Sequence, residues 1–179
     1  MVQAINQALR LHLEKHQDTV VIGEDLAFGG VFRCTSGLLK DFGSKRIINS
    51  PITEQGILGF SLGVCMAGGN VISEIQFADY LHPGFDQIMN EVTKYRYRSG
   101  SSTKMGSFVI RAPSGAVGHG GLYHSQSPES HYCIPGIRIV VPSNAYRAKG
   151  LLLAAIDNPD PTLIFEPKVL YRSNGRFST

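Results

Sequence analysis

Residues 54–80 read EQGILGFSLGVCMAGGNVISEIQFADY, and this stretch decides the fold. The first part, from Gln55 to Asn70, carries no charge, and its apolar residues predict a helix over Gln55–Ala67. The next apolar run predicts a strand over Val71–Ile75. A helix as apolar as this one is normally buried, so we expect it to lie inside the molecule.

The same alternation of helix and strand continues on both sides of this stretch. Apolar strands that are separated by helices are typical of a parallel sheet covered on both faces. We therefore predict an α/β fold with a mostly parallel sheet flanked by helices on both faces, in one domain over residues 1–179. The further predicted helices are Val2–His16, Gly84–Arg98 and Ala145–Asp157, and the further predicted strands are Thr19–Ile22, Ile47–Asn49, Ser107–Arg111, Arg138–Val141 and Thr162–Glu166.

The composition is that of a globular domain. Of 179 residues, 42% are hydrophobic and 17% charged, and the net charge of +3 is too small and scattered to indicate nucleic acid or a membrane as a partner. The longest uncharged run is short and rich in glycine, which disfavours a membrane span. The odd number of cysteines (Cys34, Cys65 and Cys133) and the absence of a CxxC spacing favour a reducing compartment and no metal cluster.

Glu54 is the first candidate for a functional residue, because it is a lone carboxylate at the start of an apolar helix. A buried carboxylate is costly unless a group donates a hydrogen bond to it, so we expect a partner for Glu54. A structural alternative also fits the residue. Thr53 is a plausible N-cap, and a carboxylate in the first turn is favoured by the helix dipole.

Gln76 and Tyr80 follow the strand predicted over Val71–Ile75, at the point where side chains project from the carboxyl end of a sheet. Ligand pockets of α/β proteins are usually built at such ends, so both residues are candidates for a pocket wall. The structural alternative is a hydrogen-bonded amide and a tyrosine at the edge of the core.

Residues 115–129 form the loop that is richest in glycine, serine and histidine. It lacks the GxxxxGK[ST] pattern of a phosphate-binding loop, and His119 and His124 have no obvious third metal ligand nearby. An imidazole on such a loop suits general acid and base chemistry, although His124 also fits a hydrogen-bonded surface residue. The basic and aromatic residues 94–98 end a predicted helix, which favours a structural or interface role over nucleic-acid binding.

Four of these segments together resemble a known family. They are residues 54–56, 74–80, 119–120 and 123–129, and they resemble the β subunit of thiamine-dependent 2-oxo acid dehydrogenases over essentially the whole chain. Residues 29–35, 95–100 and 165–168 are more similar to the branched-chain (2-oxoisovalerate) enzymes than to the pyruvate enzymes.

The resemblance implies a pyrimidine-binding domain that holds the aminopyrimidine half of thiamine diphosphate. By this resemblance Glu54 hydrogen-bonds the pyrimidine nitrogen opposite the amino group, while Gln76 and Tyr80 line the same pocket. His124 matches a histidine that assists proton transfer during decarboxylation or acyl transfer to lipoate. The catalytic residues expected on this basis are Glu54 and His124.

The resemblance also implies partners. The diphosphate and its magnesium would be held by an α subunit through a Gly-Asp-Gly motif, which this chain lacks. We expect an α2β2 heterotetramer that decarboxylates branched-chain 2-oxo acids and passes the acyl group to the lipoyl group of the E2 acyltransferase. The family's carboxy-terminal domain is not expected within residues 1–179. A pyruvate-type β subunit and a non-catalytic assembly module stay open as alternatives.

Two further expectations depend on the resemblance. The first is a potassium site formed mainly by main-chain carbonyl groups, which maps to Gly106, Phe108, Val109, Ala155, Asn158 and Asp160. The second is the location, which is the mitochondrial matrix for a eukaryotic source, with the transit peptide absent from this sequence, and the cytoplasm otherwise.

Overall fold

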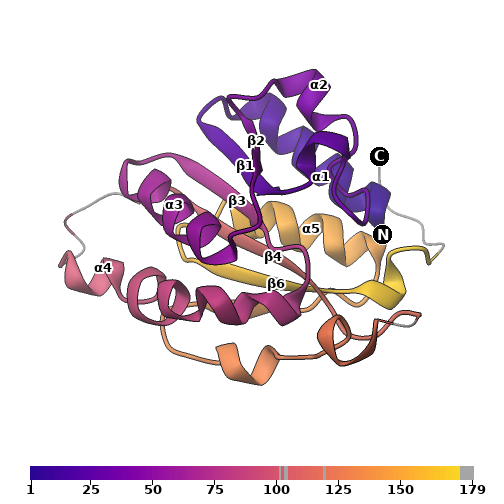
Figure 1. Cartoon of the computed structure of the whole chain (residues 1–179). Helices are drawn as coiled ribbons and strands as arrows, with labels where there is room; N and C mark the ends of the chain where they lie inside the picture. The colour runs from indigo at the N-terminus through magenta and orange to yellow at the C-terminus, as the bar shows by residue number, and fades with distance from the viewer. Residues whose placement is uncertain (101, 103–104, 119, 174–179) are drawn as a thin grey trace.

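A six-stranded parallel sheet forms the centre of the computed structural model, which describes residues 1–100, 102, 105–118 and 120–173 (Figure 1). The strand order is β2-β1-β3-β4-β6-β5, and each neighbouring pair is parallel, as predicted. The strands are β1 (Thr19–Glu24), β2 (Ile47–Ser50), β3 (Asn70–Glu74), β4 (Phe108–Ser114), β5 (Arg138–Val140) and β6 (Thr162–Pro167).

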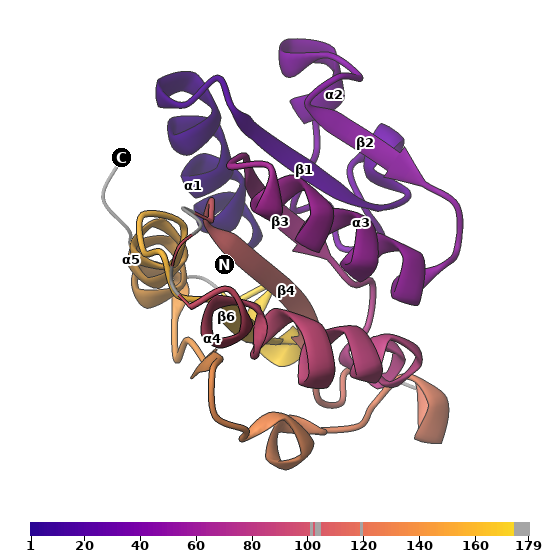
Figure 2. The ribbon, with the colours of Figure 1, turned by 90° about the vertical axis from the view of Figure 1, so that its left-hand side faces the viewer.

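Helices cover both faces of the sheet, so the predicted fold class is confirmed (Figure 2). On one face lie α1 (Val2–Lys15) and α5 (Ala145–Ile156), which pack against each other. On the other face lie α3 (Glu54–Met66) and the helical segments between Ala78 and Arg98. The short helix α2 (Leu38–Phe42) precedes β2 at one edge.

Two hydrophobic cores result, one on each face of the sheet. Alternate residues of a strand point to opposite faces, so Val21 packs with α1 and α5 while Ile22 packs with α3. All seven residues of β4 are buried, since this strand is covered on both faces. No helix among the described residues is long and apolar enough to cross a bilayer.

The helix predicted over Gly84–Arg98 is interrupted, which corrects the sequence expectation. A 3₁₀ segment (Ala78–Gly84) continues through the helical residues Phe85 and Asp86 into a π-helical segment (Gln87–Val92), and a turn at Thr93 and Lys94 separates that segment from α4 (Tyr95–Arg98). Pro83, whose missing N–H and fixed φ disfavour the interior of an α-helix, lies in the 3₁₀ segment directly before the predicted helix start at Gly84. Further 3₁₀ segments span Leu26–Phe28, Gly121–Tyr123, Glu129–Tyr132 and Lys168–Leu170.

The expectation that the apolar helix is buried holds for only one of its faces. Ile57, Leu58 and Leu62 of α3 are buried against the sheet, but Gly59 and Phe60 are exposed. Phe60 is 52% exposed, which is unusual for a large aromatic side chain. The face of α3 that points away from the sheet is therefore also apolar, and in this chain it is exposed to solvent.

Candidate functional site

The candidate site lies at the carboxyl edge of the sheet. The chain leaves β1 outward to β2, returns to β3 beside β1, and then continues in the opposite direction to β4. This makes the β1–β3 boundary a topological switch point, where ligands of open α/β sheets usually bind. This edge therefore brings together three residues, which are Glu24 at the end of β1, Gln76 just after β3 and Glu54 at the start of α3.

Glu54 is the first residue of α3, and Thr53 occupies the N-cap position without a side-chain capping bond. The Glu54 residue is half-buried rather than buried, because the helix start lies at the rim of the sheet. Within the described part of the chain, the Glu54 carboxylate has neither a hydrogen-bond donor nor an ion-pair partner. Its oxygens are therefore open to a ligand.

Glu24, at the end of β1, is a carboxyl that the sequence analysis missed. The residue is 5% exposed, and its Oε1 atom is buried without a partner among the described residues. Burial raises the pKa of Glu24 to about 7, and the negative charges of Glu54 and Asp25 add to this effect. A carboxyl with a pKa near neutrality beside a second carboxyl is a typical feature of functional sites.

Gln76 follows β3, and its side chain contacts the loop after β1. Gln76 Nε2 donates to Asp25 Oδ2 at 2.8 Å. Asp25 has a φ of 58°, a left-handed conformation that costs a residue with a Cβ some strain. The amide of Gln76 is thus engaged, as the structural alternative expects, and it joins the two loops at the switch point.

Tyr80 and His124 meet over Phe77, so the structure brings these two predicted residues together. The ring centroids of Phe77 and His124 are 4.7 Å apart in an edge-to-face arrangement, and those of Tyr80 and His124 are 5.5 Å apart. Tyr80 and His124 are both half-buried. His124 therefore has an aromatic surround on one side and solvent on the other, which suits a residue that exchanges protons at a rim.

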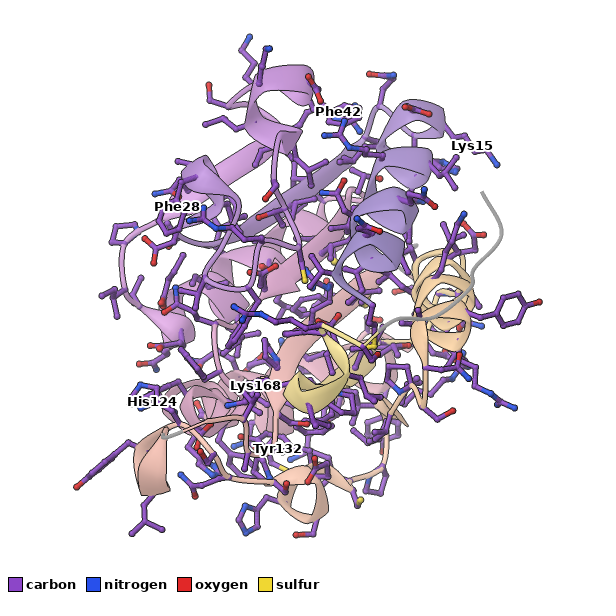
Figure 3. All side chains as sticks on the ribbon, turned by 90° about the vertical axis from the view of Figure 1, so that its right-hand side faces the viewer. Lys15, Phe28, Phe42, His124, Tyr132 and Lys168 are labelled. Carbon is purple, nitrogen blue, oxygen red and sulfur yellow. The ribbon has the colours of Figure 1, made fainter. Side chains whose placement is uncertain are left out.

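Lys168 fixes the loop that carries His124. Its Nζ donates to the main-chain carbonyl of His124 and lies 4.9 Å from the centre of the Phe77 ring (Figure 3). Lys168 is 3% exposed, and burial lowers the pKa of its ammonium group while Asp79 opposes that change. A buried ammonium that contacts a carbonyl and an aromatic ring restricts both partners.

Asp79 holds the other end of the same loop. Its Oδ1 accepts a hydrogen bond from the backbone N–H of Gln126 at 2.9 Å, and its Oδ2 is buried without a partner among the described residues. Lys168 and Asp79 therefore hold positions 124 and 126 of the same loop. His119, which the sequence analysis considered beside His124, lies outside the described residues.

A buried ion network underlies the site. Arg111 is fully buried in β4 and donates from Nη1 to Glu74 Oε2 at 2.5 Å. Its Nε and Nη2 also donate to the two oxygens of Glu166, at 2.7 and 2.8 Å. Tyr171 Oη donates to Glu166 Oε2 at 2.5 Å. This network ties β3, β4 and β6 together just below the loops, and the sequence analysis did not identify it.

The residues proposed for potassium lie at the opposite, amino edge of the sheet. Gly106 precedes β4, and Asn158 follows α5; both line an open cavity of about 280 Å³. The carboxylate of Asp160 is instead paired with Arg96 at 2.6 Å and with Arg138 at 3.0 Å. Phe108 and Val109 belong to β4, and Ala155 belongs to α5. Their side chains are apolar, so only their main-chain carbonyl groups could bind potassium. The potassium site stays a prediction.

A family model described as the transketolase pyrimidine binding domain matches residues 1–174. Over 173 residues the chain is 57% identical to the mitochondrial 2-oxoisovalerate dehydrogenase subunit beta 2 of Arabidopsis thaliana, covering 96% of this chain and 48% of that protein. It is 46% identical to the 2-oxoisovalerate dehydrogenase subunit beta of Pseudomonas aeruginosa, covering 99% and 50%.

More distant relatives share the fold. The pyruvate dehydrogenase E1 component subunit beta of Staphylococcus epidermidis is 41% identical over 97% of this chain and 54% of that protein. A solved structure described as a split gene transketolase, inactive beta4 tetramer, aligns with a TM-score of 0.70 at 22% identity, over 90% of this chain and 48% of that chain. The chain spans about half the length of the curated relatives it matches. From the family match and the fold, we conclude that the chain belongs to the transketolase pyrimidine-binding domain family.

Proposed function

We propose that this chain is the pyrimidine-binding part of the β subunit of a thiamine diphosphate-dependent branched-chain 2-oxo acid (2-oxoisovalerate) dehydrogenase. One observation carries the proposal. In a chain 57% identical to such a β subunit, Glu54 lies at the switch point of the sheet with an open carboxylate.

The residues at this edge fit the aminopyrimidine half of thiamine diphosphate. Glu54 offers a carboxylate without a protein partner among the described residues, and Tyr80 and Phe77 offer aromatic surface nearby. The orphaned Oε1 of Glu24 marks a second polar group that awaits a hydrogen bond. The diphosphate and magnesium would be held by an α subunit.

When bound, thiamine diphosphate would supply a nucleophilic carbon, generated by loss of a C–H proton, and an electron sink for the charge left by decarboxylation of a 2-oxo acid. Glu54 would hold a proton at the pyrimidine nitrogen and so orient the ring. Glu24, with its pKa of about 7, would be partly protonated at neutral pH, which limits the negative charge beside Glu54. His124, on a loop held by Lys168, would move a proton at the rim of the site.

The proposed function includes partners. Several large hydrophobic residues next to the site are exposed, namely Ile52, Phe60, Leu122 and Tyr123. Ile52 is 83% and Leu122 84% exposed. An apolar rim around half of a site supports closure by another subunit. We therefore propose an E1 α subunit in an α2β2 heterotetramer, with the lipoyl-bearing E2 acyltransferase as acceptor. For a eukaryotic source the proposed location is the mitochondrial matrix, since eukaryotic relatives up to 57% identical are named mitochondrial, and for any other source it is the cytoplasm.

The test uses the full-length β chain assembled with its α subunit. Glu54→Gln should lower decarboxylation of 3-methyl-2-oxobutanoate at least about 100-fold, because general acid–base groups contribute about 10²–10⁴-fold. The matched control Glu14→Gln changes an exposed carboxylate on α1 and should leave turnover unchanged. Near-normal turnover of the Glu54 variant would refute the assigned role.

Substrate profiling separates the alternatives. A pyruvate-type enzyme, which the 41% identity to a pyruvate dehydrogenase subunit keeps open, would prefer pyruvate over the oxo acids derived from valine, leucine and isoleucine. A non-catalytic assembly module would show no thiamine-dependent activity after the α subunit and the remainder of the β chain are supplied.

A further inference from the structure

A histidine pair and an aspartate meet at the amino edge of the sheet, away from Glu54. His12 lies in the last turn of α1, and His16 follows that helix as its C-cap residue. Asp157 is the C-cap residue of α5, the helix that packs against α1 (Figure 1). One ligand atom from each of these three side chains lies within 4.8 Å of the others.

His12 is prepared as a ligand by its surroundings. The residue is 3% exposed, and its Nε2 is hydrogen-bonded to Thr19 Oγ1 at 2.8 Å. If Nε2 carries the proton and donates to Thr19, Nδ1 has a free lone pair that faces Asp157 Oδ1 at 3.9 Å. Histidines that bind metals usually donate their second ring N–H to such a partner.

The distances are close to those of a metal site. A tetrahedral zinc ion with bonds of about 2.0–2.2 Å places its ligand atoms about 3.4 Å apart. The 3.9 Å separation of His12 Nδ1 and Asp157 Oδ1 needs only a small adjustment. The ring of His16 is stacked on that of His12 at 4.3 Å and must rotate to share an ion with it. His16 is half-buried and Asp157 exposed, so both have room to move.

We propose that His12, His16 and Asp157 form a binding site for zinc or a similar divalent transition metal, which ties the end of α1 to the end of α5. Two imidazole nitrogens and one carboxylate oxygen suit zinc, cobalt or nickel better than potassium, magnesium or calcium. The open cavity of about 280 Å³, which these three residues help to line, leaves the fourth position to water. The proposal is independent of the function proposed above.

The first experiment measures metal binding to the chelator-treated chain in a Cys133→Ser background, because Cys133 is an exposed thiol and thiolates are zinc ligands. Calorimetric titration with ZnCl₂ should show one ion per chain, and CoCl₂ should give the visible absorption of tetrahedral cobalt. A chain that binds no zinc under these conditions would overturn the proposal.

Variants then locate the ion. His16→Ala and Asp157→Asn change side chains at the surface, and each should weaken zinc binding at least about tenfold with an unchanged circular dichroism spectrum. Thr19→Val removes the hydrogen bond to His12 and should weaken binding about 10–100-fold. His131→Ala is the matched control, since it removes an exposed histidine near His82. Zinc affinity that is lost in the control, or kept in both surface variants, would contradict the assignment.

Discussion

Glu24→Gln tests whether a buried carboxyl at the end of β1 makes the fold sensitive to pH. Burial, together with the charges of Glu54 and Asp25, raises the pKa of Glu24 from 4.5 to about 7. A carboxyl whose pKa is raised on folding favours the native state in its protonated form. Its contribution to stability is complete below about pH 4.5 and is lost as the pH rises through about 7.

The size of the effect follows from the two pKa values. Each pKa unit corresponds to about 1.4 kcal/mol, so the loss between about pH 4 and pH 9 is at most about 3 kcal/mol. Glutamine has the shape of the protonated acid but does not ionise, so the variant should not suffer this loss. The quantity to follow is the unfolding free energy of Glu24→Gln minus that of the unchanged chain. We expect this difference to rise by about 2 kcal/mol as the pH is raised across that range.

The assay is urea unfolding of both chains at about pH 5, 7 and 8.5, with the difference in unfolding free energy compared at each pH. Taking the difference removes the contribution of histidines that titrate equally in both chains. Glu14→Gln, an exposed carboxylate on α1, is the control and should show no trend. A difference for Glu24→Gln that stays constant within about 0.5 kcal/mol would refute the reasoning.

Three other substitutions test the surroundings of the site. Arg111→Met leaves two buried carboxylates without their cation and should cost about 3–5 kcal/mol of unfolding free energy in urea titrations; a loss below about 1 kcal/mol would contradict the network. Lys168→Met removes the hydrogen bond that holds the loop at His124. In the proposed enzyme, assembled with its α subunit, this variant should keep its cofactor affinity but acylate the lipoyl group more slowly, because His124 is misplaced. Unchanged acylation would exclude the positioning role of Lys168. Gly23→Ala puts a Cβ 2.6 Å from the carbonyl oxygen of Glu74 and should cost about 1–3 kcal/mol, so an unchanged urea midpoint would argue against this close approach of β1 and β3.

The strands were predictable from the sequence because each is a short apolar run bounded by polar residues. β3 and β6 were placed within one residue at each end, and the parallel arrangement followed from burial on both faces. The helix predicted over Gly84–Arg98 was wrong in its continuity, since apolar spacing is similar in α-helical and π-helical turns. The burial of Glu54 was overestimated because an apolar sequence does not show which face meets solvent.

The site was only partly predictable. Gln76 and Tyr80 were proposed from their position after a strand, and the same rule applied to β1 would also have proposed Glu24. Lys168 could not be found, because its contact with His124 joins residues 44 positions apart and exists only through the tertiary fold. Arg111 looked like a polar strand end, and only the structure shows that it is fully buried between Glu74 and Glu166.

The exposed apolar face of α3 has a consequence for how cells handle this chain. A newly made chain that displays Phe60 of α3, and Ile52 just before this helix, offers the kind of surface that chaperones bind and proteases sample. If the chain pairs with the proposed α subunit, we expect the supply of that subunit to set the lifetime of the chain, so that surplus copies are degraded and the two subunits reach matched amounts without matched synthesis. Pulse-chase labelling with and without the α subunit would measure this coupling, and equal half-lives would disprove it.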